Sequence, residues 1–146
     1  MLTDGDRIRN LLAEYCALVD AGDLDGVGRL MADATLHTLD GTEIARGAEG
    51  VTELYRGLVK LHEDGTPRTQ HLVSNVHIGD PSPSGEVEVR SVFVVLQAVE
   101  GLPLQPVITG RYVDSVAPVG IGGWKFVRRA FGPGLTGDLS HHMEPI

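Results

Sequence analysis

The sequence contains a single cysteine, Cys16, which excludes an intramolecular disulfide and a cysteine-based metal cluster. Cys16 falls within an apolar stripe of helical spacing, where a lone cysteine is usually a small core residue. No apolar run approaches the roughly 20 residues that a membrane-spanning helix needs. The first residues also lack the basic and apolar regions of a secretion signal. We therefore expect a soluble, cytoplasmic protein.

Positive charge is scarce as well. The chain has 12 Lys and Arg against 20 Asp and Glu, for a formal net charge of −8. Nucleic acids and anionic membrane surfaces attract basic patches, so we expect neither as a partner. The six histidines show no His-Glu-x-x-His spacing, and no glycine-rich phosphate loop introduces a helix. We therefore expect no metal and no organic cofactor.

The first half of the chain carries helical periodicity. Apolar residues recur at three- and four-residue steps after Thr3 and Asp4, which can cap a helix that stops at Gly22. The same spacing predicts a short helix over residues 24–31 and a third over residues 48–62. Between them, Asp40-Gly41 is a strong hairpin turn that separates two short strands, over residues 34–39 and 42–45.

The pattern of the second half of the chain predicts long strands joined by short turns. We predict strands over residues 69–78, 86–99, 105–116 and 124–131, followed by a flexible tail over about residues 133–146. Such strands form an antiparallel sheet that must curl. The sequence thus predicts one α+β domain over residues 1–146, a cone-shaped curved antiparallel sheet closed by three helices around a central pocket. Residues 92–96 are apolar on both strand faces, so we expect a homodimer through the outer face.

The order of these elements and several local strings resemble the SnoaL-like family of the nuclear transport factor 2-like superfamily. The matching strings lie at residues 14–23, 69–75, 110–112, 123–126 and 137–142. The resemblance covers nearly the whole chain and implies a cystatin-like cone. It does not fix the activity, because the superfamily includes dehydratases, isomerases, cyclases, hydrolases, dioxygenase β subunits and non-catalytic binders.

One subset of that family is more similar. Bile acid 7α-dehydratase, scytalone dehydratase and lindane dehydrochlorinase pair an Asp at the end of the first helix with a His on the first long strand. Asp20 and His71 match these positions, Tyr15 resembles the tyrosine that precedes the Asp in the bile acid enzyme, and Asn75 has the spacing of an asparagine in such sequences. Thr38 stands where ketosteroid isomerases have their general-base Asp, so the resemblance does not extend to that activity. The Asp-Arg-Asp pattern of limonene epoxide hydrolases also has no counterpart.

The resemblance implies catalytic roles for Asp20, His71 and Tyr15. A carboxylate that accepts the Nδ1–H of a histidine fixes the ring tautomer and frees Nε2 to act as a general base. Such a base removes a proton next to a carbonyl, and the Tyr15 hydroxyl could donate to that carbonyl. Dehydration, isomerisation and aldol cyclisation all use these parts, on an apolar or polycyclic small molecule.

Other residues complete this interpretation. Tyr55, Phe93 and Phe131, with Asn75, are candidate substrate-binding residues. We expect the arginines on the predicted strands to be surface or interface charges; they are Arg90, Arg111, Arg128 and Arg129. We also expect the tail, with its His141-His142 pair, to fold over the mouth of the pocket. Two alternatives stay open from the sequence: a non-catalytic carrier of a hydrophobic ligand, and an accessory subunit of a larger enzyme.

Overall fold

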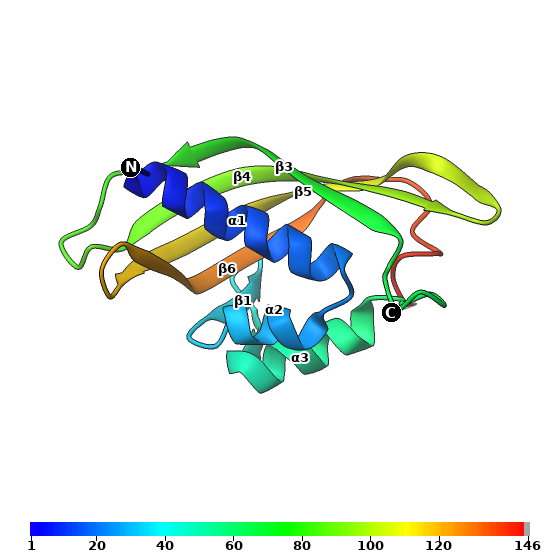
Figure 1. Cartoon of the computed structure of the whole chain (residues 1–146), viewed down its shortest axis with the longest axis horizontal. Helices are drawn as coiled ribbons and strands as arrows, with labels where there is room; N and C mark the ends of the chain where they lie inside the picture. Colours follow the sequence, from blue (N-terminus) through cyan, green and yellow to red (C-terminus); the bar gives the residue numbers. More distant parts are fainter. Residues whose placement is uncertain (145–146) are drawn as a thin grey trace.

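The structure is a computed structural model that describes residues 1–144 of the chain. Those residues form three helices and six strands (Figure 1). In chain order they are α1 (Asp4–Asp20), α2 (Leu24–Leu30), β1 (Thr35–Thr38), β2 (Glu43–Arg46), α3 (Gly47–Leu58), β3 (Thr69–Ile78), β4 (Val87–Val99), β5 (Leu102–Val119) and β6 (Gly123–Thr136). Within this part of the chain, no helix has the length and apolar content needed to cross a membrane.

Helix α1 is fixed at both ends by local sequence. Thr3 and Asp6 form a reciprocal capping box at its N-terminus. At the other end Gly22 has a φ of +74°, and a Cβ there would lie 2.0 Å from the carbonyl oxygen of Gly65. Only glycine permits this close approach of two backbones. The turn therefore sets the end of α1, which carries Asp20, against the loop that leads into β3.

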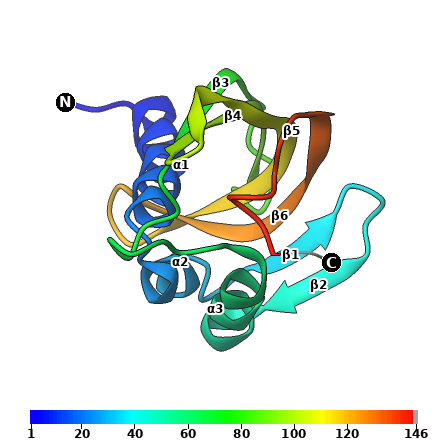
Figure 2. The same cartoon turned by 90° about the vertical axis from the view of Figure 1, so that its right-hand side faces the viewer.

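The six strands form one sheet in the order β2-β1-β6-β5-β4-β3. Strands β3 to β6 pair antiparallel in sequence order, and β3 is an edge strand. The sheet curls around an interior that α1 on one side and the α2–α3 pair on another help to close (Figure 2). The predicted α+β class with a curved sheet and three helices is confirmed. One detail was wrong: β1 runs parallel to β6, so the sheet is not purely antiparallel.

Strand β4 defines the inner face of the sheet. Its alternate residues are buried, while the residues between them are more exposed. Phe93 and Val95 belong to the buried set and lie opposite Val73 and His71 of β3, so these four side chains share the inner face. The buried core joins this face to the apolar side of α1.

Two predicted boundaries differ most from the structure. Helix α3 ends at Leu58 rather than near residue 62, because the backbone N–H of Lys60 donates to the His142 carbonyl instead of continuing the helix. Strand β6 continues to Thr136 and pairs with β5 as far as Ile108, so residues 133–136 are strand rather than tail. Residues 137–144 then turn back across the end of the sheet (red in Figure 2). Residues 145 and 146 of the predicted tail lie outside the described residues.

Candidate functional site

The structure brings Asp20 and His71 into direct contact. The Nδ1 atom of His71 lies 2.5 Å from Asp20 Oδ1. The same carboxylate accepts two further hydrogen bonds from β3, from the backbone N–H of His71 at 2.8 Å and from the Thr69 hydroxyl at 2.9 Å. A carboxylate at a helix C-terminus is mildly unfavourable by itself. These three donors offset that cost and attach the end of α1 to the outer edge of the sheet.

This contact fixes the chemistry of the His71 ring. An ionised carboxylate only accepts hydrogen bonds, so Nδ1 carries the proton and Nε2 of a neutral ring is the basic atom. The His71 side chain is 7% exposed and the Asp20 side chain 21%. Because water is largely excluded, the charge that Asp20 offers to an imidazolium is only weakly screened. The pair is therefore arranged to accept a proton at Nε2.

Asp20 and His71 also border a cleft of about 450 Å³ between α1 and β3. This volume is within the usual range for small-molecule sites, roughly 300–1,000 Å³. The lining is mainly apolar and comprises Arg9, Leu12, Ala13, Cys16, Ala17, Asp20, Gln70, His71, Leu72, Val73 and Val76. Burial raises the pKa of the Cys16 thiol to about 11, so this residue stays protonated at neutral pH and is no nucleophile.

Tyr15 lies on the core side of α1 and does not line this cleft. Its hydroxyl is hydrogen-bonded to the hydroxyl of Tyr55, so the structure brings these two predicted residues together. Both tyrosines are buried, and burial raises the pKa of each well above its ordinary value. Both therefore keep their protons at neutral pH. The Tyr15–Tyr55 pair can act as a hydrogen-bond donor but not as a base.

Arg129 lies beside these tyrosines, and its predicted surface position was wrong. The residue is 0% exposed, with its guanidinium carbon 4.3 Å from the Tyr15 ring centre and 3.7 Å from that of Tyr112. It donates to Asp114 at 2.8 and 3.0 Å. Burial alone would lower the pKa of Arg129, but Asp114 raises it above its ordinary value. Burial raises the pKa of Asp114, and Arg129 opposes that shift. We take the pair as ionised, because the guanidinium donates to both carboxylate oxygens in a bidentate contact.

The other predicted arginines and binding residues divide between surface and core. Arg90 and Arg111 are exposed and Arg128 is half-buried. Phe93 is buried and stacks on Tyr112 with ring centres 4.5 Å apart, and the half-buried Phe131 packs against the same tyrosine. Asn75 is exposed, with a φ of +53°.

A β-bulge explains the position of Asn75. Between Ser74 and His77 the pairing of β3 with β4 shifts by one residue. A regular strand would place Asn75 and His77 on the same face as His71, and the bulge ends that alternation. Beyond the bulge, Val76 and Ile78 pack against the core and His77 is exposed.

His142 completes the surroundings of His71. The C-terminal tail brings its ring to a centre-to-centre distance of 5.9 Å from the His71 ring, in an edge-to-face arrangement. Burial lowers the pKa of His142 to about 4, His71 and His62 add to this shift, and Asp20 opposes it. The ring is therefore neutral at physiological pH. The sequence shows the His141-His142 pair in the tail, but no periodicity places its rings.

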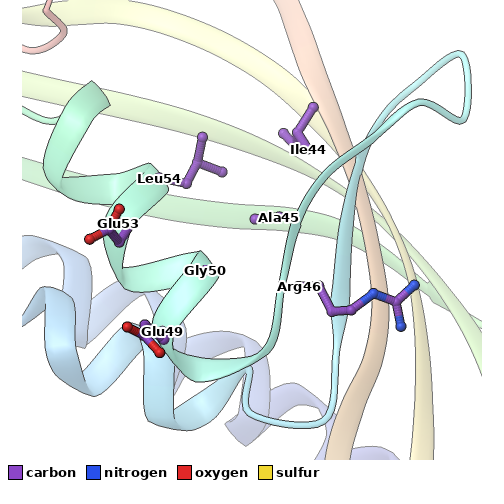
Figure 3. A pocket seen from close by; sticks show the side chains of 7 residues that line it. All are labelled: Ile44, Ala45, Arg46, Glu49, Gly50, Glu53 and Leu54. Atoms are coloured by element: carbon purple, nitrogen blue, oxygen red, sulfur yellow. The ribbon is translucent and has the colours of Figure 1, made fainter.

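A second hollow lies between β2 and α3 and has a volume of about 690 Å³ (Figure 3). Its charged residues, Arg46, Glu49 and Glu53, are exposed, and Figure 3 shows the Arg46 side chain directed away from the two glutamates. No histidine lines it. Across residues 1–144, no three His, Cys, Asp or Glu side chains gather as a metal site would require. The Asp20–His71 region is therefore the candidate active site.

The chain belongs to the SnoaL-like domain family, whose model matches residues 1–130. A comparison with curated proteins gave no significant match. Among solved structures, a "Putative Scytalone Dehydratase" from Novosphingobium aromaticivorans is 26% identical, with a TM-score of 0.69 over 90% of this chain and 85% of the other. An NTF2-like protein with a cystatin-like fold from the same species is 20% identical, with a TM-score of 0.69 over 94% and 86%. LinA is 21% identical, with a TM-score of 0.65 over 96% and 92%.

Proposed function

We propose that the protein is a cofactor-independent lyase or isomerase that performs dehydratase-type acid–base chemistry on an apolar, carbonyl-bearing small molecule. The observation that carries this proposal is the contact between Asp20 and His71 at the border of a mainly apolar cleft. The likeness to the scytalone dehydratase-type structure supports the same reaction class. The cleft volume suits a molecule of two or more fused rings, of steroid or polyketide type.

In the proposed reaction, His71 Nε2 removes a proton from the carbon next to the carbonyl. Asp20 holds the Nδ1–H bond and stabilises the imidazolium that forms. The electron pair of the broken C–H bond becomes the new C=C bond, and the hydroxyl on the next carbon leaves. Nε2–H returns its proton to that hydroxyl, which departs as water, and the histidine is regenerated. Return of the proton to a different carbon would give an isomerisation instead.

Tyr15 is the proposed donor to the carbonyl oxygen, with Tyr55 behind it. Negative charge develops on that oxygen as the proton leaves, and a hydroxyl that keeps its own proton can stabilise it. The guanidinium of Arg129 against the Tyr15 ring adds positive potential at this place. Tyr15 lies on the core side of α1, so this role requires the carbonyl end of the substrate to reach past the edge of β3 into the interior.

Exchange of α-protons with solvent deuterium tests the proposal without knowledge of the natural leaving group. We expect the wild-type protein to accelerate exchange at the α-carbon of at least one fused-ring ketone, in a panel of 1-tetralone and a saturated steroid 3-ketone. His71→Ala should reduce that rate to the uncatalysed background, because no other base takes the proton. Mass spectrometry of the recovered ketone measures the rate.

If wild-type protein and His71→Ala exchange the α-protons of every ketone at the same rate, the acid–base proposal is wrong. Binding of the ketones without exchange would then indicate a ligand carrier. Co-purification with a larger chain would indicate an accessory subunit.

We also propose that the protein forms a homodimer through the outer face of the sheet. The half-buried side chains of Val92, Val94 and Leu96 form an apolar strip there, and Leu72 on the neighbouring strand is 43% exposed. Such a patch usually marks an interface. Light scattering after size exclusion should give twice the chain mass for wild-type protein and the single-chain mass for Val94→Glu. A monomeric wild-type protein at micromolar concentration would rule this dimer out.

A further inference from the structure

The C-terminal tail is attached to the domain mainly through its backbone. The carbonyl of His141 accepts from Gln97 Nε2 and from His62 Nε2, each at 2.8 Å. The carbonyl of Ser140 accepts from Lys60 Nζ at 2.8 Å, and that of His142 accepts from the Lys60 backbone at 2.9 Å. None of these contacts involves the imidazole of His142. The ring is therefore held in place without being needed for the attachment.

That imidazole is buried with an unsatisfied polar atom. His142 is 6% exposed, and its Nδ1 has no hydrogen-bond partner among residues 1–144. A buried polar atom without a partner costs about 1–3 kcal/mol, and most such atoms in proteins do have a partner. An apolar side chain would fill the same space at no such cost. His142 does not line the cleft of about 450 Å³, so a molecule that pairs with this nitrogen has to enter beside the tail.

A second unsatisfied atom lies on the same part of the inner face. Gln97 uses its Nε2 twice, toward the carbonyls of Pro67 and His141, while its Oε1 is buried without a partner among the described residues. Gln97 lies opposite Thr69, two residues along β3 from His71, so its side chain shares the face that carries His71. The Thr69 hydroxyl in turn donates to Asp20. An unpaired acceptor and an unpaired ring nitrogen thus flank the proposed base.

We propose that His142 contacts the substrate directly, and that its Nδ1, with Gln97 Oε1, binds the hydroxyl group of the molecule on which His71 acts. This inference rests on the proposed function and extends it, because it places the hydroxyl group of the substrate in the region under the C-terminal tail. A hydroxyl can donate to Oε1 and accept from a ring N–H, which matches the two unpaired groups. The substrate class is then a hydroxylated fused-ring ketone.

The distance between the two histidine rings is compatible with this arrangement. One oxygen bound to a nitrogen of each ring, at about 2.8 Å from both, holds those nitrogens at most roughly 5.6 Å apart. The ring centres lie 5.9 Å apart, so a shared hydroxyl reaches both rings where the two nitrogens are on facing edges. A neutral His142 also has no positive charge to attract the Asp20 carboxylate, so it does not compete with His71 for that group.

Binding of 2-tetralol and tetralin, which differ by one hydroxyl group, tests the inference by calorimetry or NMR titration. Neither probe has a carbonyl, so neither is consumed. We expect His142→Phe to weaken 2-tetralol binding about tenfold, the size of one lost buried hydrogen bond, and to leave tetralin binding within about twofold. His142→Asn places an amide atom at the Nδ1 position and should keep most of the 2-tetralol affinity. His141→Phe, next to it in the chain, is the matched control and should change neither.

If His142→Phe weakens the binding of both probes equally, the His142 ring only packs against them, and the inference is wrong. It is also wrong if wild-type protein does not bind 2-tetralol more tightly than tetralin. Ketone exchange by wild-type protein without a His142-dependent preference for 2-tetralol would overturn this inference and leave the proposed function intact. A His142-dependent preference without exchange would support the hydroxyl site and refute the acid–base chemistry.

Discussion

Replacing Asp20 with asparagine should lower the rate of ketone α-proton exchange by about 10²–10⁴, the usual contribution of a positioned base. The amide has nearly the shape of the carboxylate but only one oxygen, and the backbone N–H of His71 needs that oxygen because it can only donate. The NH2 group then faces Nδ1 and cannot accept its proton. The favoured tautomer then carries its proton on Nε2, where the base must be free. The variant also removes the charge that stabilises the imidazolium. Exchange rates of wild-type protein and variant, measured on the same ketone, give the ratio.

Asp23→Asn is the matched control for this prediction. It removes the same charge three residues further along, and asparagine can replace aspartate as the N-terminal cap of α2. We expect it to exchange within about twofold of wild type. The contrary outcome is an Asp20→Asn protein that exchanges as fast as Asp23→Asn. Asp20 would then serve only to fasten α1 to the edge of β3 through the His71 N–H and the Thr69 hydroxyl.

The sequence predicted the elements well where local periodicity decides them. Thr3 and Gly22 bound α1 as expected, and the strand pattern located β3 within its observed limits, Thr69–Ile78. The choice of Asp20 and His71 came from family resemblance and not from periodicity. Asp20 is 49 residues from Thr69 and 51 from His71, and no local pattern measures such a separation.

The exposure of Asn75 and the burial of Arg129 share one physical cause. Asn75 lies within a β-bulge of β3 and Arg129 lies just beyond one in β6, and each bulge reverses the alternation of faces. In β6 the extra residue is Val127, opposite the Ser115–Val116 step of β5; without it, Arg128 rather than Arg129 would point inward with Phe126. A bulge depends on how two strands pair, so one strand read alone does not show it.

The position of His142 beside His71 could not be predicted from the sequence for a different reason. The donors that hold the tail, Lys60, His62 and Gln97, bind its backbone carbonyls, which every sequence has. No side-chain pattern in the tail therefore predicts where it attaches. The histidine pair was visible in the sequence, but its position depended on contacts that only the folded chain reveals.

Asp114→Leu should lower the free energy of unfolding by about 3–5 kcal/mol, because it leaves the Arg129 guanidinium buried without a counter-charge. Arg129 cannot relieve this by losing its proton, since an arginine stays charged in proteins. Urea unfolding followed by circular dichroism measures the change. The exposed pair of Arg56 and Asp25 is the control, and Arg56→Met should cost less than about 1 kcal/mol.

The double variant Asp114→Leu with Arg129→Met distinguishes the charge from the packing. Removing both charges and keeping the volume should recover most of the stability lost in the single variant, because a buried ion pair contributes little net free energy beyond an apolar replacement. Recovery of stability without recovery of ketone exchange would mean that Arg129 serves the site rather than the fold, through its guanidinium against the Tyr15 ring. If Asp114→Leu costs no more than Arg56→Met, the ion pair with Asp114 does not stabilise the fold, and the prediction is wrong.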